Sequence, residues 1–120
     1  MVTDPLRSFK LFGLPRWNRV IMSERASVVY VDVDDTLVRS AGARRIPVPS
    51  VIDAVKEMAA NGSLLFAWSS GGADYARQVA TELGIEDIFS GFLPKPTMMI
   101  DDQNPSEWRY LTVSHPNEFT

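Results

Sequence analysis

The residues best suited to chemistry in this sequence are two clusters of aspartates, each of which follows an apolar run. Asp32 and Asp34 stand one residue apart after the first run, and the pair Asp101-Asp102 follows a second one. Carboxylates this close at the end of a buried strand are costly unless positive charge compensates them. Mg²⁺ takes a few hard oxygen ligands and keeps several waters, which leaves room for a phosphate group. The clusters therefore predict a Mg²⁺ site whose ligands are Asp32, Asp34 and Asp102.

Asp32 and Asp34 also suit the two catalytic roles of a phosphohydrolase, which are attack on phosphorus and proton transfer. An aspartate held beside Mg²⁺ and a phosphate can attack phosphorus and form an aspartyl-phosphate, which splits hydrolysis into two displacements. Asp32 is placed for that attack. Asp34 can protonate the leaving oxygen and then take a proton from the attacking water, and its main-chain carbonyl is a further candidate metal ligand.

Phosphoryl transfer also needs positive charge and hydrogen bonds on the equatorial oxygens of the phosphate. Ser69, the amides around Ser70-Gly71-Gly72 and the amine of Lys95 can supply them. Taken alone, Ser69 would be interpreted as an ordinary turn residue and Lys95 as a surface lysine. Their order along the chain with the two aspartate clusters makes them candidate catalytic and phosphate-binding residues.

The elements that must position these side chains alternate between strand and helix. Pro49 can open a helix that Asn61-Gly62 closes, and a second helix runs from about Ala73 to Leu83-Gly84. Residues 37–48 indicate a short hairpin. Apolar and β-branched runs predict strands at 28–31, 64–68, 88–93, 98–100 and 110–113. This alternation predicts an α/β fold with a mostly parallel sheet, in which ligands bind beyond the carboxyl ends of the strands.

Length and charge limit the class of protein. The 120 residues suffice for one domain, which we expect at 27–120, after an N-terminal appendage at 1–26. The appendage carries five basic and two acidic residues, whereas the remainder has a net charge of −6, so no nucleic-acid platform is indicated. No apolar run approaches the ~20 residues of a membrane span. The absence of cysteine excludes a thiolate nucleophile and is compatible with a cytoplasmic protein.

Four ordered segments resemble the motifs of the haloacid dehalogenase superfamily. They are Val-Tyr-Val-Asp-Val-Asp-Asp-Thr-Leu at 29–37, Ser69 after its apolar strand, Lys95 in Leu-Pro-Lys-Pro, and Ile100-Asp101-Asp102. The resemblance implies a three-layer Rossmann-like sheet of about five strands in the order 3-2-1-4-5. It implies Asp32 as nucleophile, Asp34 as acid/base, Ser69 and Lys95 as phosphate grips, Asp102 as the main fourth-motif ligand of Mg²⁺ and Asp101 beside it. Residues 37–48 would be the flap next to the site.

The spacings depart from this family in ways that bear on the substrate. Lys95 lies six residues before Asp101, which leaves no room for a helix between them, and neither of the longer intervals accommodates a cap domain. We therefore expect a capless phosphatase that acts on a phosphorylated small molecule or macromolecule. An uncapped site is also the reason to expect a homo-oligomer in which a second subunit covers it.

Two other functions fit parts of the pattern. A receiver-type phospho-signalling module also combines clustered acids, a hydroxyl residue and a lysine, but it keeps the lysine last, whereas here an acid pair follows Lys95. A catalytically idle relative used as a binding subunit is the second alternative. Tyr75 and Trp68 are interpreted as packing residues, Arg44-Arg45 as solvated flap residues, and His115 as a surface or structural residue.

Overall fold

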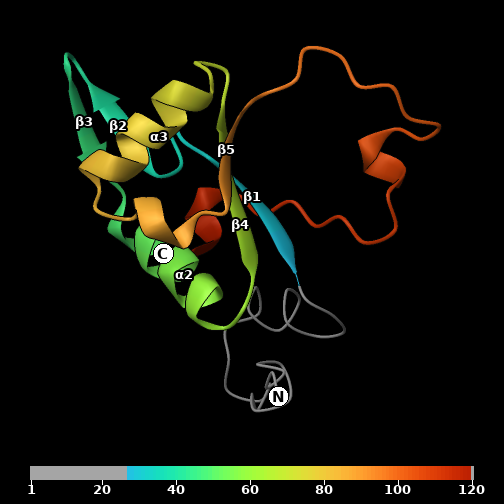
Figure 1. The fold of residues 1–120 in the computed structure, drawn as a ribbon, viewed down its shortest axis with the longest axis horizontal. Coiled ribbons are helices and arrows are strands. Elements are labelled where there is room, and N and C mark those ends of the chain that lie inside the picture. Colours follow the sequence, from blue (N-terminus) through green and yellow to red (C-terminus); the bar gives the residue numbers. More distant parts are fainter. Residues whose placement is uncertain (1–26, 120) are drawn as a thin grey trace.

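The structure is a computed structural model that describes residues 27–119, so the predicted appendage at 1–26 lies outside the described residues. Figure 1 shows a small α/β fold with two sheets. The parallel sheet contains β1 (Val28–Asp32), β4 (Leu64–Ser69) and β5 (Gly91–Pro94). The antiparallel hairpin contains β2 (Val38–Ala41) and β3 (Arg44–Pro47). The helices are α2 (Pro49–Ala60) and α3 (Ala73–Glu82), with 3-10 turns at Glu86–Ile88, Pro105–Glu107 and Pro116–Phe119.

The parallel sheet has the strand order β1-β4-β5, and its register aligns the carboxyl ends of the strands. Asp32 of β1 lies opposite Trp68, and Ser69 lies opposite Pro94 of β5. The last residues of the three strands therefore meet at one edge of the sheet. This matches the 3-2-1 part of the predicted strand order.

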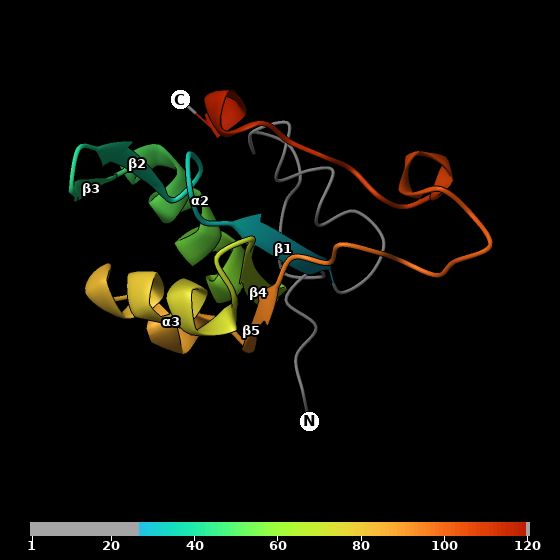
Figure 2. The same cartoon turned by 90° about the horizontal axis from the view of Figure 1, so that it is seen from above.

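Both α-helices cover the same face of this sheet (Figure 2). Each step from β1 to β4 and from β4 to β5 moves one strand in the same direction, so two right-handed crossovers put both helices on one side. Leu65 and Ala67, which point toward the helices, are fully buried, whereas Val28, Tyr30 and Leu64 on the other face are exposed. The expectation of three layers is therefore wrong for the described residues, which form two.

The face that none of the described helices covers carries an aromatic ladder. The ring of Tyr30 lies 5.4 Å from that of Phe66 and meets the ring of Trp68 edge-on at 4.9 Å. Cross-strand aromatic pairs of this kind stabilise neighbouring strands. Trp68 is thus a packing residue, as its sequence context indicates.

The strands predicted at 98–100 and 110–113 are absent from the described residues, and the one predicted at 88–93 begins later, after a 3-10 turn. The segment that follows β5 leaves the sheet as a wide loop (Figure 1), in which Ile100 is 95% exposed and Val113 84%. The segment after β5 runs away from the sheet, so neither run has a strand to pair with among the described residues.

Candidate active site

The carboxyl edge of the parallel sheet brings together most of the predicted site residues. Asp32 ends β1, Ser69 ends β4, and Lys95 follows β5 directly. The backbone N–H of Lys95 donates to the carbonyl of Ser69 over 2.9 Å, which ties the segment after β5 to the end of β4. Residues far apart in sequence are thus fixed beside one another by strand pairing and one backbone bond.

Asp32 is the centre of this cluster. Its Oδ1 lies 3.0 Å from Nζ of Lys95, and its Oδ2 accepts a hydrogen bond from Oγ1 of Thr36 over 3.1 Å. Both partners of the ion pair remain about one-third exposed, so a ligand from solvent can reach them. Nζ of Lys95 also lies 5.8 Å above the ring of Trp68. The role of Thr36 was not predicted from the sequence, and its spacing of four residues from Asp32 is the local signal for this contact.

Asp34 lies in a tight turn directly after β1. The turn is closed by the N–H of Leu37, which donates to the carbonyl of Val33 over 2.9 Å, and it places Asp35 at φ 60°, a region that aspartate tolerates. Asp34 is exposed, and its Oδ1 accepts a hydrogen bond from the hydroxyl of Tyr75 over 2.7 Å. The turn thus presents the second carboxylate on the same rim as the first.

The turn between β4 and α3 forms the other wall. Ser69 is buried, and its Oγ accepts the N–H of Gly71 over 3.0 Å, while Ser70 is exposed. Gly72 precedes α3 at φ 105°, a conformation that favours glycine. The first-turn amides of a helix attract anions, so this turn and Lys95 can together contact the oxygens of a phosphate.

The hairpin of β2 and β3 is anchored to α3 by an arginine that sequence reasoning treated as solvated. Arg45 makes a two-pronged ion pair with Glu82, with contacts of 2.7 and 2.9 Å from one nitrogen, and its guanidinium lies 5.6 Å from the ring centre of Tyr75. The hydrogen bond with Glu82 raises the pKa of Arg45 and lowers that of Glu82. Tyr75 has a raised pKa, because its hydroxyl donates to Asp34 and its ring is partly desolvated.

The aspartates of the second cluster lie apart from this group. Asp101 and Asp102 are exposed in the loop after β5, and Oδ1 of Asp101 accepts the N–H of Gln103 over 2.9 Å. Between residues 27 and 119, no three acidic or histidine side chains are gathered so as to hold a metal ion. The carboxylate of Asp32 and the main-chain carbonyl of Asp34 remain, and Mg²⁺ commonly takes only one or two carboxylates when a substrate phosphate supplies further oxygens. The chemistry of this pair therefore fits Mg²⁺ bound together with a phosphate.

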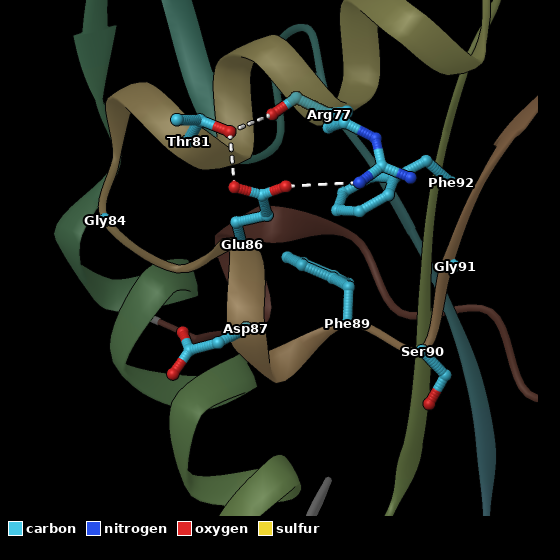
Figure 3. A pocket seen from close by; sticks show the side chains of 9 residues that line it. All are labelled: Arg77, Thr81, Gly84, Glu86, Asp87, Phe89, Ser90, Gly91 and Phe92. Carbon is cyan, nitrogen blue, oxygen red and sulfur yellow. Dashed lines mark hydrogen bonds and ion pairs between the residues drawn. The ribbon is translucent and has the colours of Figure 1, made fainter.

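A separate hollow of about 540 Å³ lies between α3, the following 3-10 turn and β5 (Figure 3). Three of its polar side chains already bond to one another, because Glu86 accepts from Arg77 over 3.2 Å and from Thr81 over 2.9 Å. Arg77 also covers the ring of Phe92. The hollow contains none of the predicted site residues, so the carboxyl edge is the better candidate for chemistry.

Comparison with known proteins gives one match. A family model described as Protein of unknown function (DUF705) matches residues 16–111. The chain belongs to this DUF705 family. No curated protein matches the chain, and no solved structure does.

The DUF705 match corrects one expectation from the sequence. The four ordered motifs pointed to the haloacid dehalogenase superfamily, but the family that matches is DUF705, with no match to that superfamily, so the recognition was wrong. The fourth motif also loses its predicted strand at 98–100. In residues 27–119 of this DUF705 chain, neither helix has the length and apolarity needed to cross a bilayer.

Proposed function

We propose that this DUF705 chain is a Mg²⁺-dependent phosphatase that hydrolyses phosphate monoesters through an aspartyl-phosphate on Asp32. The observation that carries the proposal is the pair of Asp32 and Lys95, whose charged atoms are 3.0 Å apart and still open to solvent. A carboxylate beside a cation, a buried hydroxyl and the amides of a helix N-terminus is the combination that phosphoryl transfer requires.

In the first step, one carboxylate oxygen of Asp32 attacks phosphorus while the bond from phosphorus to the leaving oxygen breaks. Asp34 gives a proton to that oxygen, which departs as an alcohol. Lys95, the hydroxyl of Ser69 and the amides of Ser70 and Gly71 hold the remaining phosphoryl oxygens. The product of this step is a mixed anhydride of Asp32 and phosphate.

In the second step, water attacks the phosphorus of the aspartyl-phosphate and breaks its bond to the Asp32 oxygen. Asp34, now ionised, takes a proton from that water, and inorganic phosphate leaves. Asp34 therefore acts as acid and then as base without a net change in its protonation over the cycle.

The carboxylate of Asp32 and the main-chain carbonyl of Asp34 are the proposed Mg²⁺ ligands at the end of β1, and Mg²⁺ would neutralise charge on the phosphoryl oxygens. Asp102 stays a proposed ligand and Asp101 a proposed neighbour of it. Asp102 lies seven residues after Lys95, a length that spans up to ~23 Å when extended, and Lys95 itself contacts Asp32. The loop can therefore bring Asp102 to the site without the predicted strand.

The substrate class follows from the open surroundings of the site. The described residues between β1 and β5 contain no cap domain, only the short hairpin of β2 and β3. We therefore propose that the substrate is a phosphorylated small molecule or a phosphorylated macromolecule. We also propose that a second copy of the chain covers the site. The mass of the full chain in solution checks the latter, because a monomer at all concentrations would contradict it.

The test is turnover of p-nitrophenyl phosphate and a panel of phosphorylated metabolites by the full chain, with Mg²⁺ and with excess EDTA. We expect Mg²⁺-dependent release of phosphate that is lost in Asp32→Asn and strongly reduced in Asp34→Asn and Lys95→Ala. Asp53→Asn, an exposed carboxylate on α2, is the matched control and should keep full activity. Full turnover by Asp32→Asn would refute the proposal. A long-lived phosphoenzyme without turnover would instead favour a signalling module.

A further inference from the structure

A continuous series of contacts joins the hairpin to the carboxylate of Asp34. Arg45 of β3 pairs with Glu82 of α3 and lies over the ring of Tyr75, and Tyr75 donates its hydroxyl to Asp34. Three of these residues had no functional role in the sequence analysis. The contacts bridge 37 residues at one end and 41 at the other, so the folded chain alone creates them.

Tyr75 reaches Asp34 because the chain leaves space for its ring. Tyr75 stands in the first turn of α3, and a Cβ on Gly71 would lie 3.0 Å from its Cδ2 and 3.3 Å from its Cγ. Such a contact is shorter than side chains ordinarily make, so a side chain at position 71 would push the ring aside. Gly71 therefore serves the placement of Tyr75 as well as the turn that holds Ser69.

Arg45 fixes the outer side of the same ring. Glu82 lies seven residues after Tyr75 on α3, two helical turns along the same face, and it also accepts from the amide of Gln78 over 3.3 Å. The planar guanidinium can therefore bind the carboxylate with two contacts and still cover the aromatic ring. Arg45 thus attaches the hairpin to α3 through Glu82 and also lies over the ring of Tyr75.

We propose that Tyr75 is a positioning residue for Asp34, and that Arg45 of the β2-β3 hairpin holds Tyr75 in place for that task. This inference rests on the proposed phosphatase function. Asp34 is exposed on a turn, and its carboxylate can rotate, whereas proton transfer needs one oxygen to face the leaving group. The hydrogen bond from Tyr75 occupies Oδ1 and leaves Oδ2 for the proton.

The experiment compares two phosphate monoesters that differ in their need for a proton donor. β-Glycerophosphate releases an alkoxide that must be protonated, whereas p-nitrophenyl phosphate releases a stable phenolate, and kcat/KM reports the first phosphoryl transfer for both. Tyr75→Phe should lower kcat/KM for β-glycerophosphate about tenfold or more, part of the ~10²-fold to 10⁴-fold effect of acid-base catalysis. For p-nitrophenyl phosphate, the loss should stay below about threefold.

Three controls separate positioning from a general structural effect. Tyr110→Phe removes a hydroxyl from an exposed ring outside the site and should leave both rates unchanged. In an Asp34→Asn background, Tyr75→Phe should cause no further loss, because the residue that it positions is already gone. Arg45→Gln should show the same substrate discrimination at about threefold, whereas Arg39→Gln on the same hairpin should show none.

The failures are distinguishable. An equal loss with both substrates, or an additive loss in the Asp34→Asn background, would overturn the role of Tyr75 while the phosphatase function stands. If Tyr75→Phe discriminates between the two esters but Arg45→Gln does not, the role of the hairpin is overturned and that of Tyr75 stands. If the wild-type chain hydrolyses neither ester with Mg²⁺, the proposed function fails, and the role of Tyr75 fails with it.

Discussion

The chain between residues 27 and 95 and the chain between 96 and 119 both contain runs of apolar side chains, but they use them differently. In the first region Val33, Leu37 and Leu65 are almost fully buried, whereas in the second Ile100 and Val113 are largely exposed. The first region contains all the strands among the described residues, and the second contains two 3-10 turns. An apolar run therefore forms a strand only where a neighbouring strand lies close enough to pair with it.

The same difference separates the two aspartate clusters. Asp32 terminates a paired strand, and the register of the sheet brings Lys95 within 3.0 Å of it. Asp101 and Asp102 follow a loop instead of a strand, and Asp101 bonds to Gln103 of its own loop. Strand pairing thus fixes the position of a reactive side chain at a strand end. A side chain in a loop reaches the same site only if a bound ligand holds the loop there.

The largest expected effect tests this contrast through stability. Leu65→Ala removes a fully buried side chain from β4 and should lower the free energy of unfolding by about 2–5 kcal/mol. Ile100→Ala, at an exposed position, should change it by less than about 0.5 kcal/mol. Urea denaturation of both variants of the full chain measures the two values. A cost of several kcal/mol for Ile100→Ala would indicate that residues 98–100 pack after all, and the contrast would collapse.

An intermediate effect tests whether Mg²⁺ recruits the second cluster. If Asp102 is a ligand, Asp102→Asn should raise the Mg²⁺ concentration that gives half-maximal turnover by about tenfold, because one charged oxygen ligand is lost. The neighbouring acid Glu107, which caps its own 3-10 turn, offers a control, and Glu107→Gln should leave the Mg²⁺ dependence unchanged. An unchanged dependence in Asp102→Asn would confine the metal ligands to the region before residue 96.

The sequence predicted most of the first region because its signals are local. The helices begin at Pro49 and after Gly72, and the strands at 28–32 and 64–69 coincide with β-branched or aromatic runs. The meeting of Asp32, Ser69 and Lys95 followed from parallel strands sharing one edge. The failed strands carried the same apolar signal, and nothing in their local sequence distinguished them from the strands that form.

The side-chain contacts around Asp34 could not be predicted in this way. Tyr75 and Asp34 are 41 residues apart, and Arg45 and Glu82 are 37 apart, with no periodicity that relates the partners. Tyr75 has an aromatic ring that suits packing, and its hydroxyl gains a role only when the turn after β1 faces the start of α3. The one local signal was Gly71, whose missing side chain leaves room for the ring.

The smallest expected effect concerns the attachment of the hairpin to α3 and its dependence on pH. The folded-state pKa of Glu82 is lowered from 4.5, chiefly by its hydrogen bond with Arg45, so this pair stabilises the fold above that value. As the pH falls through the lowered pKa, Glu82 takes up a proton and the contribution is lost, whereas Arg45 stays charged throughout. The difference in unfolding free energy between wild type and Glu82→Gln should therefore be largest near neutral pH and shrink toward pH ~3.

Urea denaturation at several pH values measures this difference, and Asp87→Asn, an exposed acid beyond α3, is the matched control that should show no such trend. Tyr75 and Gln78, the other polar groups that face the pair, do not change charge between these pH values, so the trend belongs to Glu82. A difference that stays constant with pH would mean that the ion pair contributes nothing to the fold. The hairpin would then be held by the pairing of β2 with β3 and by the turn after β1. Arg45 could then move away from Tyr75 without a change in the free energy of unfolding.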